Sequence, residues 1–254
     1  MSIEKELVER FSLEDKRGIV TGGSSGIGKS IAITLAKTGA FVFIFSRTGK
    51  FKYDGLKYDK IEHFKVDITD YEKTTKIISE IGITGIDFLV NNAGITVKKM
   101  VQDVNYNEWN KVQSVNVGAV FNICKSAFPF LKNSSSVGKI VNITSMASYL
   151  GFKEVVPYCT SKTALLGLTR SLAVEWAQEN ILVNSISPGW IKTNLLNQVI
   201  DAEREQKILN RMPLHRYGLQ EDISNMVLFL LSPSANYITG QDFAVDGGAL
   251  AFGY

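Results

Sequence analysis

The feature that most constrains the fold of this chain is a glycine-rich stretch near its start, TGGSSGIG at residues 21–28. Glycine costs roughly 0.5–1 kcal/mol relative to alanine inside a regular element, so four glycines in eight positions indicate a turn. A short, partly β-branched segment precedes the turn at residues 17–20. After it, Ile27, Ile31 and Leu35 recur at four-residue steps, as on one face of a helix, and Gly39 would end that helix. The sequence therefore predicts a strand, a glycine turn and a helix in succession.

A glycine turn in this context is suited to binding phosphate. Glycines let the backbone approach a pyrophosphate closely, and the helix N-terminus offers free N–H groups and the positive end of a dipole. The spacing is T-G-x-x-x-G-x-G, on Gly22, Gly26 and Gly28, which departs from the G-x-G-x-x-G fingerprint. A plain surface turn is the alternative, and the rest of the chain has to decide between the two.

Strand-like and helix-like segments alternate along the whole chain. Beyond residues 17–20, apolar or β-branched runs predict strands at residues 41–45, 63–67, 87–90, 139–143, 182–186 and 241–245. Helical patterns lie between most of them, and this alternation predicts an α/β fold: a doubly wound, parallel seven-stranded sheet with helices on both faces. A chain of 254 residues suits a single domain of this kind, spanning residues 1–254.

Polar or glycine-bearing residues follow the end of several predicted strands. In parallel sheets, ligands bind beyond the carboxyl ends of the strands. These residues are therefore expected to meet on one rim; they are residues 21–28, Ser46, Arg47, Asp67, residues 91–94, Ser145, Pro188 and Gly189.

Three residues in the second half of the chain point to proton-transfer chemistry. Tyr158 and Lys162 are four residues apart at the start of a predicted helix, so they project from the same face. An ammonium group beside a tyrosine favours the phenolate and lowers the pKa of the phenol, which then exchanges a proton with an alcohol or carbonyl oxygen. Ser145, which follows the fifth strand, is placed to donate a hydrogen bond to the same oxygen. The alternative is that Tyr158 and Lys162 are an ordinary pair of surface residues with no role in catalysis.

Taken together, these motifs resemble the short-chain dehydrogenase/reductase family along essentially the whole chain. The matching residues are Thr21-Gly22-x-x-x-Gly26-x-Gly28, Asn91-Asn92-Ala93-Gly94, Asn116, Ser145, Tyr158-x-x-x-Lys162, Pro188-Gly189 and Asp246-Gly247-Gly248. The resemblance implies a Rossmann-type fold and hydride transfer to or from NAD(P).

The resemblance also implies roles for individual residues. Tyr158 would be the acid/base and Ser145 would orient the carbonyl. Lys162 would hold the nicotinamide ribose and lower the pKa of Tyr158, and Asn116 would position a water that links Lys162 to solvent. The residues expected to bind the cofactor are Gly22, Ser24, Ser25, Gly26, Ile27, Gly28, Ser46, Arg47, Asp67, Ile68, Asn92, Ala93, Gly94, Tyr158, Lys162, Pro188, Gly189, Ile191 and Thr193. For Asn116 a helix contact, and for Asp67 a turn, remain the structural alternatives.

The end of the second strand predicts which nicotinamide cofactor is preferred. Ser46 stands where NAD-preferring relatives carry Asp, and Arg47 follows it. An acidic residue hydrogen-bonds a free 2′-hydroxyl, whereas an arginine accommodates a 2′-phosphate. We therefore expect NADP(H), with NAD(H) as the alternative in which Arg47 points to water or stacks on adenine.

The substrate is less well defined by the sequence. The runs Ser145-Met146-Ala147-Ser148, Glu175-Trp176-Ala177 and Arg216-Tyr217-Gly218-Leu219 look most similar to gluconate-type sugar-acid dehydrogenases. A 3-oxoacyl thioester (acyl-carrier-protein) reductase is the second reading, and a dinucleotide-sensing binding module without enzymatic activity is the third. By resemblance, residues 194–216 form the substrate lid.

The composition of the chain limits which partners, metal sites and cellular locations are expected. The net charge of +3 is too small to indicate a nucleic-acid or membrane partner. Two cysteines, Cys124 and Cys159, provide no disulfide framework, and with only two histidines a metal site has weak support. The charged start of the chain shows no apolar signal region, so we expect a cytoplasmic protein with a small-molecule substrate. A homotetramer is expected from the family, through the helices that carry Asn116 and Tyr158.

Overall fold

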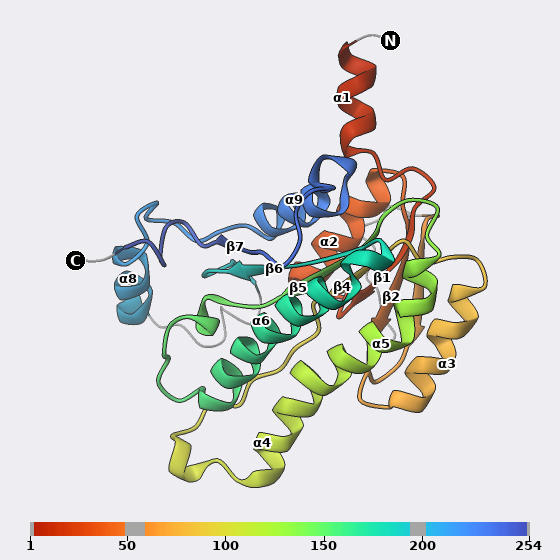
Figure 1. Cartoon of the computed structure of the whole chain (residues 1–254). Helices are drawn as coiled ribbons and strands as arrows, with labels where there is room; N and C mark the ends of the chain where they lie inside the picture. Colours follow the sequence, from red (N-terminus) through yellow and green to blue (C-terminus); the bar gives the residue numbers. More distant parts are fainter. Residues whose placement is uncertain (1–2, 49–58, 194–201, 253–254) are drawn as a thin grey trace.

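A computed structural model describes residues 3–48, 59–193 and 202–252. Seven parallel strands form one sheet, in the order β3-β2-β1-β4-β5-β6-β7 (Figure 1). The strands are β1 (Arg17–Thr21), β2 (Phe41–Ser46), β3 (Ile61–Lys65), β4 (Phe88–Asn91), β5 (Gly138–Ile143), β6 (Ile181–Pro188) and β7 (Asp242–Val245). The predicted seven-stranded parallel sheet is confirmed. The predicted bounds of most strands were wrong by one or two residues, which is the usual uncertainty at element ends.

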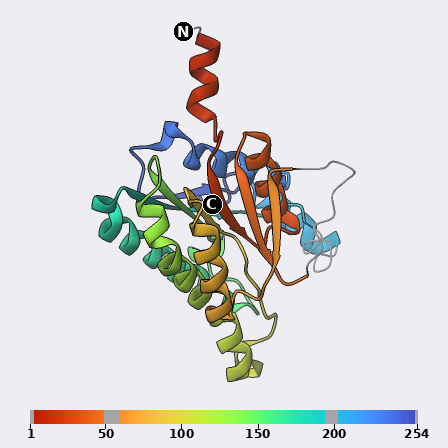
Figure 2. The same cartoon turned by 90° about the vertical axis from the view of Figure 1, so that its right-hand side faces the viewer.

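Two layers of helices cover the two faces of the sheet (Figures 1 and 2). On one face lie α3 (Tyr71–Gly82), α5 (Ala119–Lys132) and α6 (Val156–Trp176), which share a core with Ile19, Phe45 and Leu89. On the other lie α2 (Gly26–Lys37) and α9 (Gln220–Leu231), packed on Val20, Ile44 and Val141. β2 and β4 are apolar up to their last residue because both of their faces are buried, whereas β3, at the edge of the sheet, is partly exposed and carries Glu62, His63 and Lys65.

Local sequence signals fix several helix starts. Asn105 and Glu108 form a capping box at α4 (Tyr106–Gln113), and Asp70 accepts a hydrogen bond from the backbone of Lys73 at the start of α3. A π-helical segment, η2 (Ser114–Gly118), joins α4 to α5. Short 3-10 turns are η1 (Val101–Asp103), η3 (Met146–Ser148), η4 (Ala177–Glu179) and η5 (Pro233–Ala235), and α8 (Ala202–Asn210) precedes α9.

The first helix, α1 (Ile3–Phe11), projects from the rest of the molecule (Figures 1 and 2). Its root is tied to the body where the Ser234 hydroxyl donates to the Arg10 carbonyl, at 3.0 Å. Because β1 begins shortly after α1, this helix lies at the amino edge of the sheet. The glycine turn lies at the opposite, carboxyl edge.

Candidate active site

The glycine turn between β1 and α2 is tightly folded and leaves the start of α2 open. Gly22 and Gly26 have φ angles of 66° and 54°, which side chains rarely tolerate. A Cβ on Gly28 would collide with the Gly22 carbonyl and the Asn92 amide, so only glycine fits there. A Cβ on Gly26 would come within 4.0 Å of Thr193. The turn therefore forms a cradle of backbone with Thr193 beside it.

Thr21 and Asn92 hold this turn against the end of β4. The Thr21 hydroxyl accepts hydrogen bonds from the backbone N–H groups of Asn92 and Ala93, at 3.0 and 3.1 Å. The Asn92 side chain donates to the Thr21 carbonyl at 3.0 Å. Asn92 was expected to line a cofactor groove. In the structure its amide ties two rim loops together. Thr21 shares this role; the sequence placed Thr21 at the rim but not among the cofactor-binding residues.

Tyr158, Ser145 and Lys162 meet at the same rim. Tyr158 lies in the first turn of α6, and its phenol is hydrogen-bonded to the Ser145 side chain. Ser145 is the N-cap of η3, two residues after the end of β5, and its hydroxyl accepts a hydrogen bond from the Ala147 N–H at 3.1 Å. The Lys162 Nζ donates to the Ile143 carbonyl at 2.7 Å and lies 5.7 Å from the centre of the Tyr158 ring.

Burial dominates the electrostatics of this cluster. It raises the pKa of Tyr158, and the hydrogen bond from Ser145 opposes that shift. Burial also lowers the pKa of Lys162, which is 4% exposed, to about 8. The net direction at Tyr158 is opposite to the lowering that the sequence led us to expect, because loss of solvent around the phenol is the largest cause of the shift in its pKa.

Asn116, in the π-helical segment, is fully buried and bonded on both ends of its amide. Its oxygen accepts from the Ile95 N–H at 2.8 Å, and its nitrogen donates to the Ile95 carbonyl and the Ser161 hydroxyl, both at 2.9 Å. Ser161 donates in turn to the Tyr158 carbonyl at 2.7 Å. Asn116 therefore locks the loop after β4 onto the first turn of α6. It also lies beside Lys162, since both side chains approach Gly94.

At the end of β2, Ser46 and Arg47 occupy the carboxyl edge of the sheet. Ser46 is buried and its hydroxyl lies 2.7 Å from His63 Nε2 on β3. Arg47 is exposed, and its charge contributes to the lowered pKa of Asp67, after the larger effect of the Thr69 backbone hydrogen bond. Sequence reasoning missed His63. The alternation of β3, which puts Ile61, His63 and Lys65 on one face, was the available signal.

The remaining expected cofactor residues differ in exposure. Ser25 and Gly94 are exposed; Ser24, Ile27, Ala93, Gly189 and Thr193 are partly buried; Pro188, Ile68 and Ile191 are buried. Gly189 packs closely on Asp246, and Ile191 pairs with Gly218 in an isolated bridge. The side chains of Ile68 and Ile191 are buried, so at these two positions the backbone rather than the side chain would contact a bound cofactor.

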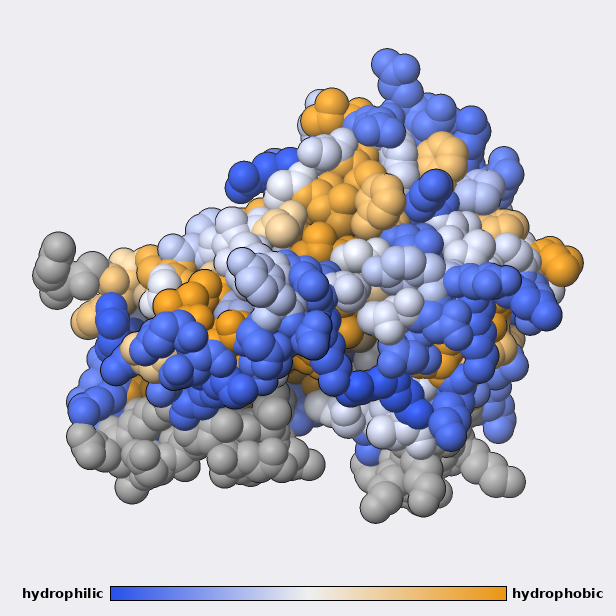
Figure 3. All heavy atoms as spheres, turned by 90° about the horizontal axis from the view of Figure 1, so that it is seen from below, coloured by the Kyte–Doolittle hydropathy of each residue, from blue (hydrophilic) through white to orange (hydrophobic). Residues whose placement is uncertain are grey.

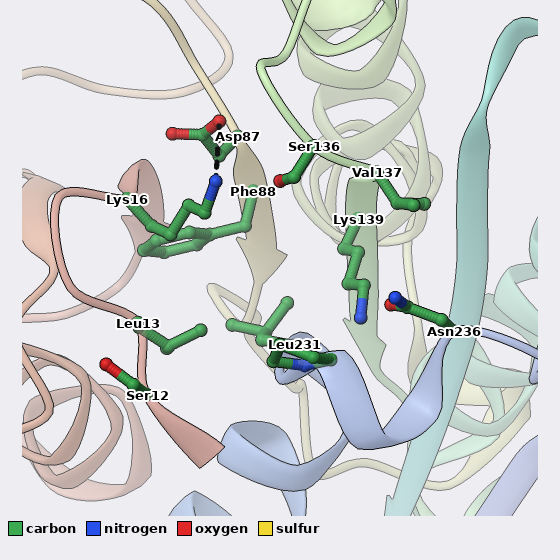
Figure 4. Close-up of a pocket in the computed structure, with 11 residues that line it drawn as sticks. Ser12, Leu13, Lys16, Asp87, Phe88, Ser136, Val137, Lys139, Leu231 and Asn236 are labelled. Carbon is green, nitrogen blue, oxygen red and sulfur yellow. Dashed lines mark ion pairs between the residues drawn. The ribbon is translucent and has the colours of Figure 1, made fainter. Parts of the chain in front are cut away.

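A separate cavity of about 70 Å³ lies at the other edge of the sheet (Figure 4). Lys16, Asp87 and Lys139 are among its lining residues, and the Lys16 Nζ lies 4.0 Å from the Asp87 carboxylate. Asp87 and Lys139 stand at the amino ends of their strands, so this cavity is remote from Tyr158.

Within the described residues, no group of three or more His, Cys, Asp and Glu side chains is arranged to hold a metal ion. No helix in that part of the chain is both long and apolar enough to cross a bilayer.

Comparison with known proteins agrees with this geometry. Residues 22–249 match a family model described as enoyl-(acyl carrier protein) reductase. A 2-dehydro-3-deoxy-D-gluconate 5-dehydrogenase from Dickeya dadantii is 35% identical, covering 96% of this chain and 99% of the relative. A 3-oxoacyl-[acyl-carrier-protein] reductase from Buchnera aphidicola is 38% identical, covering 94% and 98%.

Solved structures of similar proteins match almost the whole chain. One is provisionally described as an NAD(P)-dependent gluconate 5-dehydrogenase from Beutenbergia cavernae with NADP bound at low occupancy; its TM-score is 0.90 at 37% identity, covering 95% of this chain and 99% of that one. Another is a gluconate 5-dehydrogenase from Burkholderia cenocepacia in complex with NADP and tartrate, with a TM-score of 0.87 at 28% identity, covering 96% and 99%. The chain belongs to the short-chain dehydrogenase/reductase family and is an NAD(P)-dependent oxidoreductase.

Proposed function

We propose that the protein interconverts a secondary alcohol and a ketone of a sugar acid or related polyol, with NADP(H) as the preferred cofactor. The observation that carries the chemistry is the hydrogen-bonded pair of Tyr158 and Ser145, with Lys162 on the same helix face. All three lie at the carboxyl edge of the sheet, where the glycine turn also opens.

The residues at this edge fit a nicotinamide dinucleotide. The backbone cradle at Gly22, Gly26 and Gly28 and the open N-terminus of α2 match a pyrophosphate. When bound, the cofactor supplies or accepts a hydride. Lys162 would hold the nicotinamide ribose, and Thr193 and the backbone at Ile191 would close over the nicotinamide and pyrophosphate.

The protein's own part is proton transfer and orientation. The Tyr158 hydroxyl donates its proton to the carbonyl oxygen during reduction, and the Tyr158 phenolate accepts the alcohol proton during oxidation. Ser145 donates a hydrogen bond to the same oxygen and supports the charge that develops on it. Burial raises the pKa of Tyr158 and so favours its neutral phenol, the form that acts as the acid. Asn116 is a positioning residue in this scheme: through Ser161 it fixes the turn of α6 that carries Tyr158.

The sugar-acid assignment draws on the Dickeya and Burkholderia relatives and on positive groups near the expected lid, residues 194–216. Residues 194–201 of that segment lie outside the described part of the chain. Arg216 pairs with Asp222 at 3.5 Å, and His215 contacts the Leu209 carbonyl at 3.2 Å. Lys153 and Arg211, both exposed, are therefore the cations we favour to meet a substrate carboxylate.

The second candidate is reduction of a 3-oxoacyl thioester, favoured by the similarity to the Buchnera protein. Cofactor oxidation with ketogluconates and with an acetoacetyl thioester separates the two. Rapid reduction of the thioester, with no turnover of ketogluconates, would move the assignment to the second candidate. No turnover of either class, with the cofactor still bound, would favour the binding-module alternative.

NADP(H) preference is proposed from Ser46 and the exposed Arg47 at the end of β2. The NADP bound in the Beutenbergia and Burkholderia relatives supports it. Comparing kcat/KM for NADP(H) and NAD(H) tests it, and equal values would contradict it. A cytoplasmic location also stays a prediction, which rests on the low number of cysteines in the sequence.

A further inference from the structure

His63 and Ser46 form a polar pair between β2 and β3 on the side of these strands that faces α2. His63 Nε2 lies 2.7 Å from Ser46 Oγ. Ile44 and Ile61, which flank this pair on the same face, are buried in the core beneath α2. Since Ser46 is 8% exposed, its hydroxyl has few orientations available and His63 decides among them.

This pair stands beside the glycine turn. The Gly22 N–H donates to the Phe45 carbonyl at 2.8 Å, which brings the turn onto the end of β2. A Cβ on Gly23 would strike Ile44, so the turn lies over the face that carries Ile44 and Ser46. In the proposed binding mode, this is the side on which the adenosine ribose meets the protein.

Arg47 does not stand alone at this edge. Its charge also acts on Asp67, and further donors lie on the neighbouring strand. On β3, Lys65 is the register partner of Ser46 and projects on the same face as His63. The carboxyl edge of β2 and β3 therefore carries several hydrogen-bond donors, and Ser46 is the buried donor among them.

We propose that His63 is a positioning residue that makes the protein selective for the 2′-phosphate of NADP(H) by orienting the Ser46 hydroxyl. Phosphate oxygens accept hydrogen bonds and do not donate them. When His63 Nε2–H donates to Ser46 Oγ, the hydroxyl proton of Ser46 is free to point at the phosphate. In the other tautomer, Ser46 donates to His63 and offers the phosphate only an acceptor. The 2′-hydroxyl of NAD(H) donates or accepts, so it is insensitive to this choice. The inference rests on the proposed cofactor preference.

Binding of two adenosine probes tests the inference without turnover. Adenosine 2′,5′-bisphosphate carries the 2′-phosphate and 5′-AMP lacks it. In calorimetric titrations, we expect His63→Leu to weaken the bisphosphate about two- to tenfold, the effect of one neutral hydrogen bond, and to leave 5′-AMP unchanged. His63→Gln, whose amide donates from a similar position, should restore part of the affinity. Glu62→Gln, on the opposite face of β3, is the matched control and should change neither.

Turnover and a double-mutant cycle give the second readout. KM for NADP(H) should rise in His63→Leu with kcat unchanged, and Ser46→Ala should show the same selective loss. Adding His63→Leu to Ser46→Ala should then cost little more, because His63 acts through Ser46. Equal weakening of both probes, no weakening of either, or fully additive losses would overturn the inference. If the wild-type protein binds both probes equally, the proposed NADP(H) preference itself fails, which is a different result.

Discussion

At the residue scale, the proposed chemistry depends on the phenol of Tyr158. Replacing it with phenylalanine keeps the ring in α6 and removes the proton that the reaction needs. We expect Tyr158→Phe to lower turnover about a hundredfold or more, as for loss of a positioned acid or base, with cofactor affinity nearly unchanged. Steady-state kinetics and cofactor titration measure the two effects.

A second tyrosine provides the control for this variant. Tyr149, nine positions earlier, donates to the Asp242 carboxylate at 2.9 Å and lies half-exposed after η3. Tyr149→Phe should keep most of the turnover. A Tyr158→Phe variant that also keeps most of its turnover would show that another group transfers the proton.

Arg47 carries the residue-scale prediction on cofactor choice. A charge-assisted contact with phosphate contributes about 1.5–3 kcal/mol, which corresponds to roughly a ten- to hundredfold change in affinity. Arg47→Ala should therefore raise KM for NADP(H) by about that factor and leave KM for NAD(H) and kcat unchanged, because the phosphate is remote from the reacting atoms. Arg10→Ala, an exposed arginine on α1, is the control. An unchanged NADP(H) KM would show that Arg47 does not contact the phosphate.

At the element scale, the glycine turn is the part of the chain that we expect to tolerate substitution least. A Cβ on Gly28 meets the backbone carbonyl of Gly22 and the Asn92 amide, neither of which can move without opening the turn. We expect Gly28→Ala to lose cofactor binding and to lower the melting temperature. Gly167→Ala in α6, where the new Cβ meets nothing within 4 Å apart from its chain neighbours and the adjoining backbone of the helix, should instead raise stability by about 0.5–1 kcal/mol. Unimpaired cofactor binding in Gly28→Ala would contradict the cradle.

The elements were largely predictable from the sequence because their signals are local. The uninterrupted apolar run at residues 41–45 and the spacing of Ile27, Ile31 and Leu35 identify a buried strand and an amphipathic helix without knowledge of the rest of the chain. The projecting α1 was not predicted, since a nine-residue helix has little intrinsic stability and the sequence does not show what supports it.

Contacts between elements were the part that local signals did not reveal. The pairing of His63 with Ser46 joins residues 17 positions apart, and the bonds from Asn116 to Ile95 and Ser161 span 21 and 45 positions. The pKa of Tyr158 was mispredicted for the same reason. Its direction depends on burial by the whole rim, whereas the sequence shows only the neighbouring lysine.

At the scale of the whole molecule, the predicted homotetramer needs apolar surface on α5 and α6. Four large apolar residues of these helices, Val120, Leu165, Leu172 and Trp176, are buried in this chain's own core. Phe121 and Val174 remain exposed, at 52% and 82%. Figure 3, a view from below, also shows a hydrophobic area amid largely hydrophilic surface.

Light scattering at micromolar concentration should give the mass of four chains. Val174→Asp should shift the wild-type assembly toward smaller species, because it places a charge in an apolar contact. Ile83→Asp, at an equally exposed apolar position after α3, is the control and should leave the mass unchanged. A monomeric wild-type protein would reject the tetramer.

Stability at alkaline pH should depend on Lys139, the buried lysine near the cavity of Figure 4. Its ammonium donates to the Ser232 carbonyl at 2.5 Å, and burial lowers its pKa to about 8. Below about pH 8 the lysine is protonated in both the folded and unfolded chain. Between about pH 8 and 10.5 the unfolded chain binds more protons, so its contribution to stability rises with pH.

Urea titrations at pH 7.5 and 9.5 measure this effect. The free energy of unfolding of wild type, relative to Lys139→Met, should increase by up to about 2 kcal/mol between the two pH values. Lys37→Met, at the exposed end of α2, should show no such change relative to wild type. An identical pH dependence in wild type and Lys139→Met would contradict the assignment.

The projecting α1 has a practical consequence. It is attached at the amino edge of the sheet, whereas Tyr158, Ser145 and the glycine turn open at the carboxyl edge. An affinity tag or surface tether fused ahead of Ile3 would therefore leave the proposed active site at the carboxyl edge of the sheet facing the solvent. Immobilised through this helix, the enzyme should exchange substrate and nicotinamide cofactor with a flowing solution as freely as it does unattached.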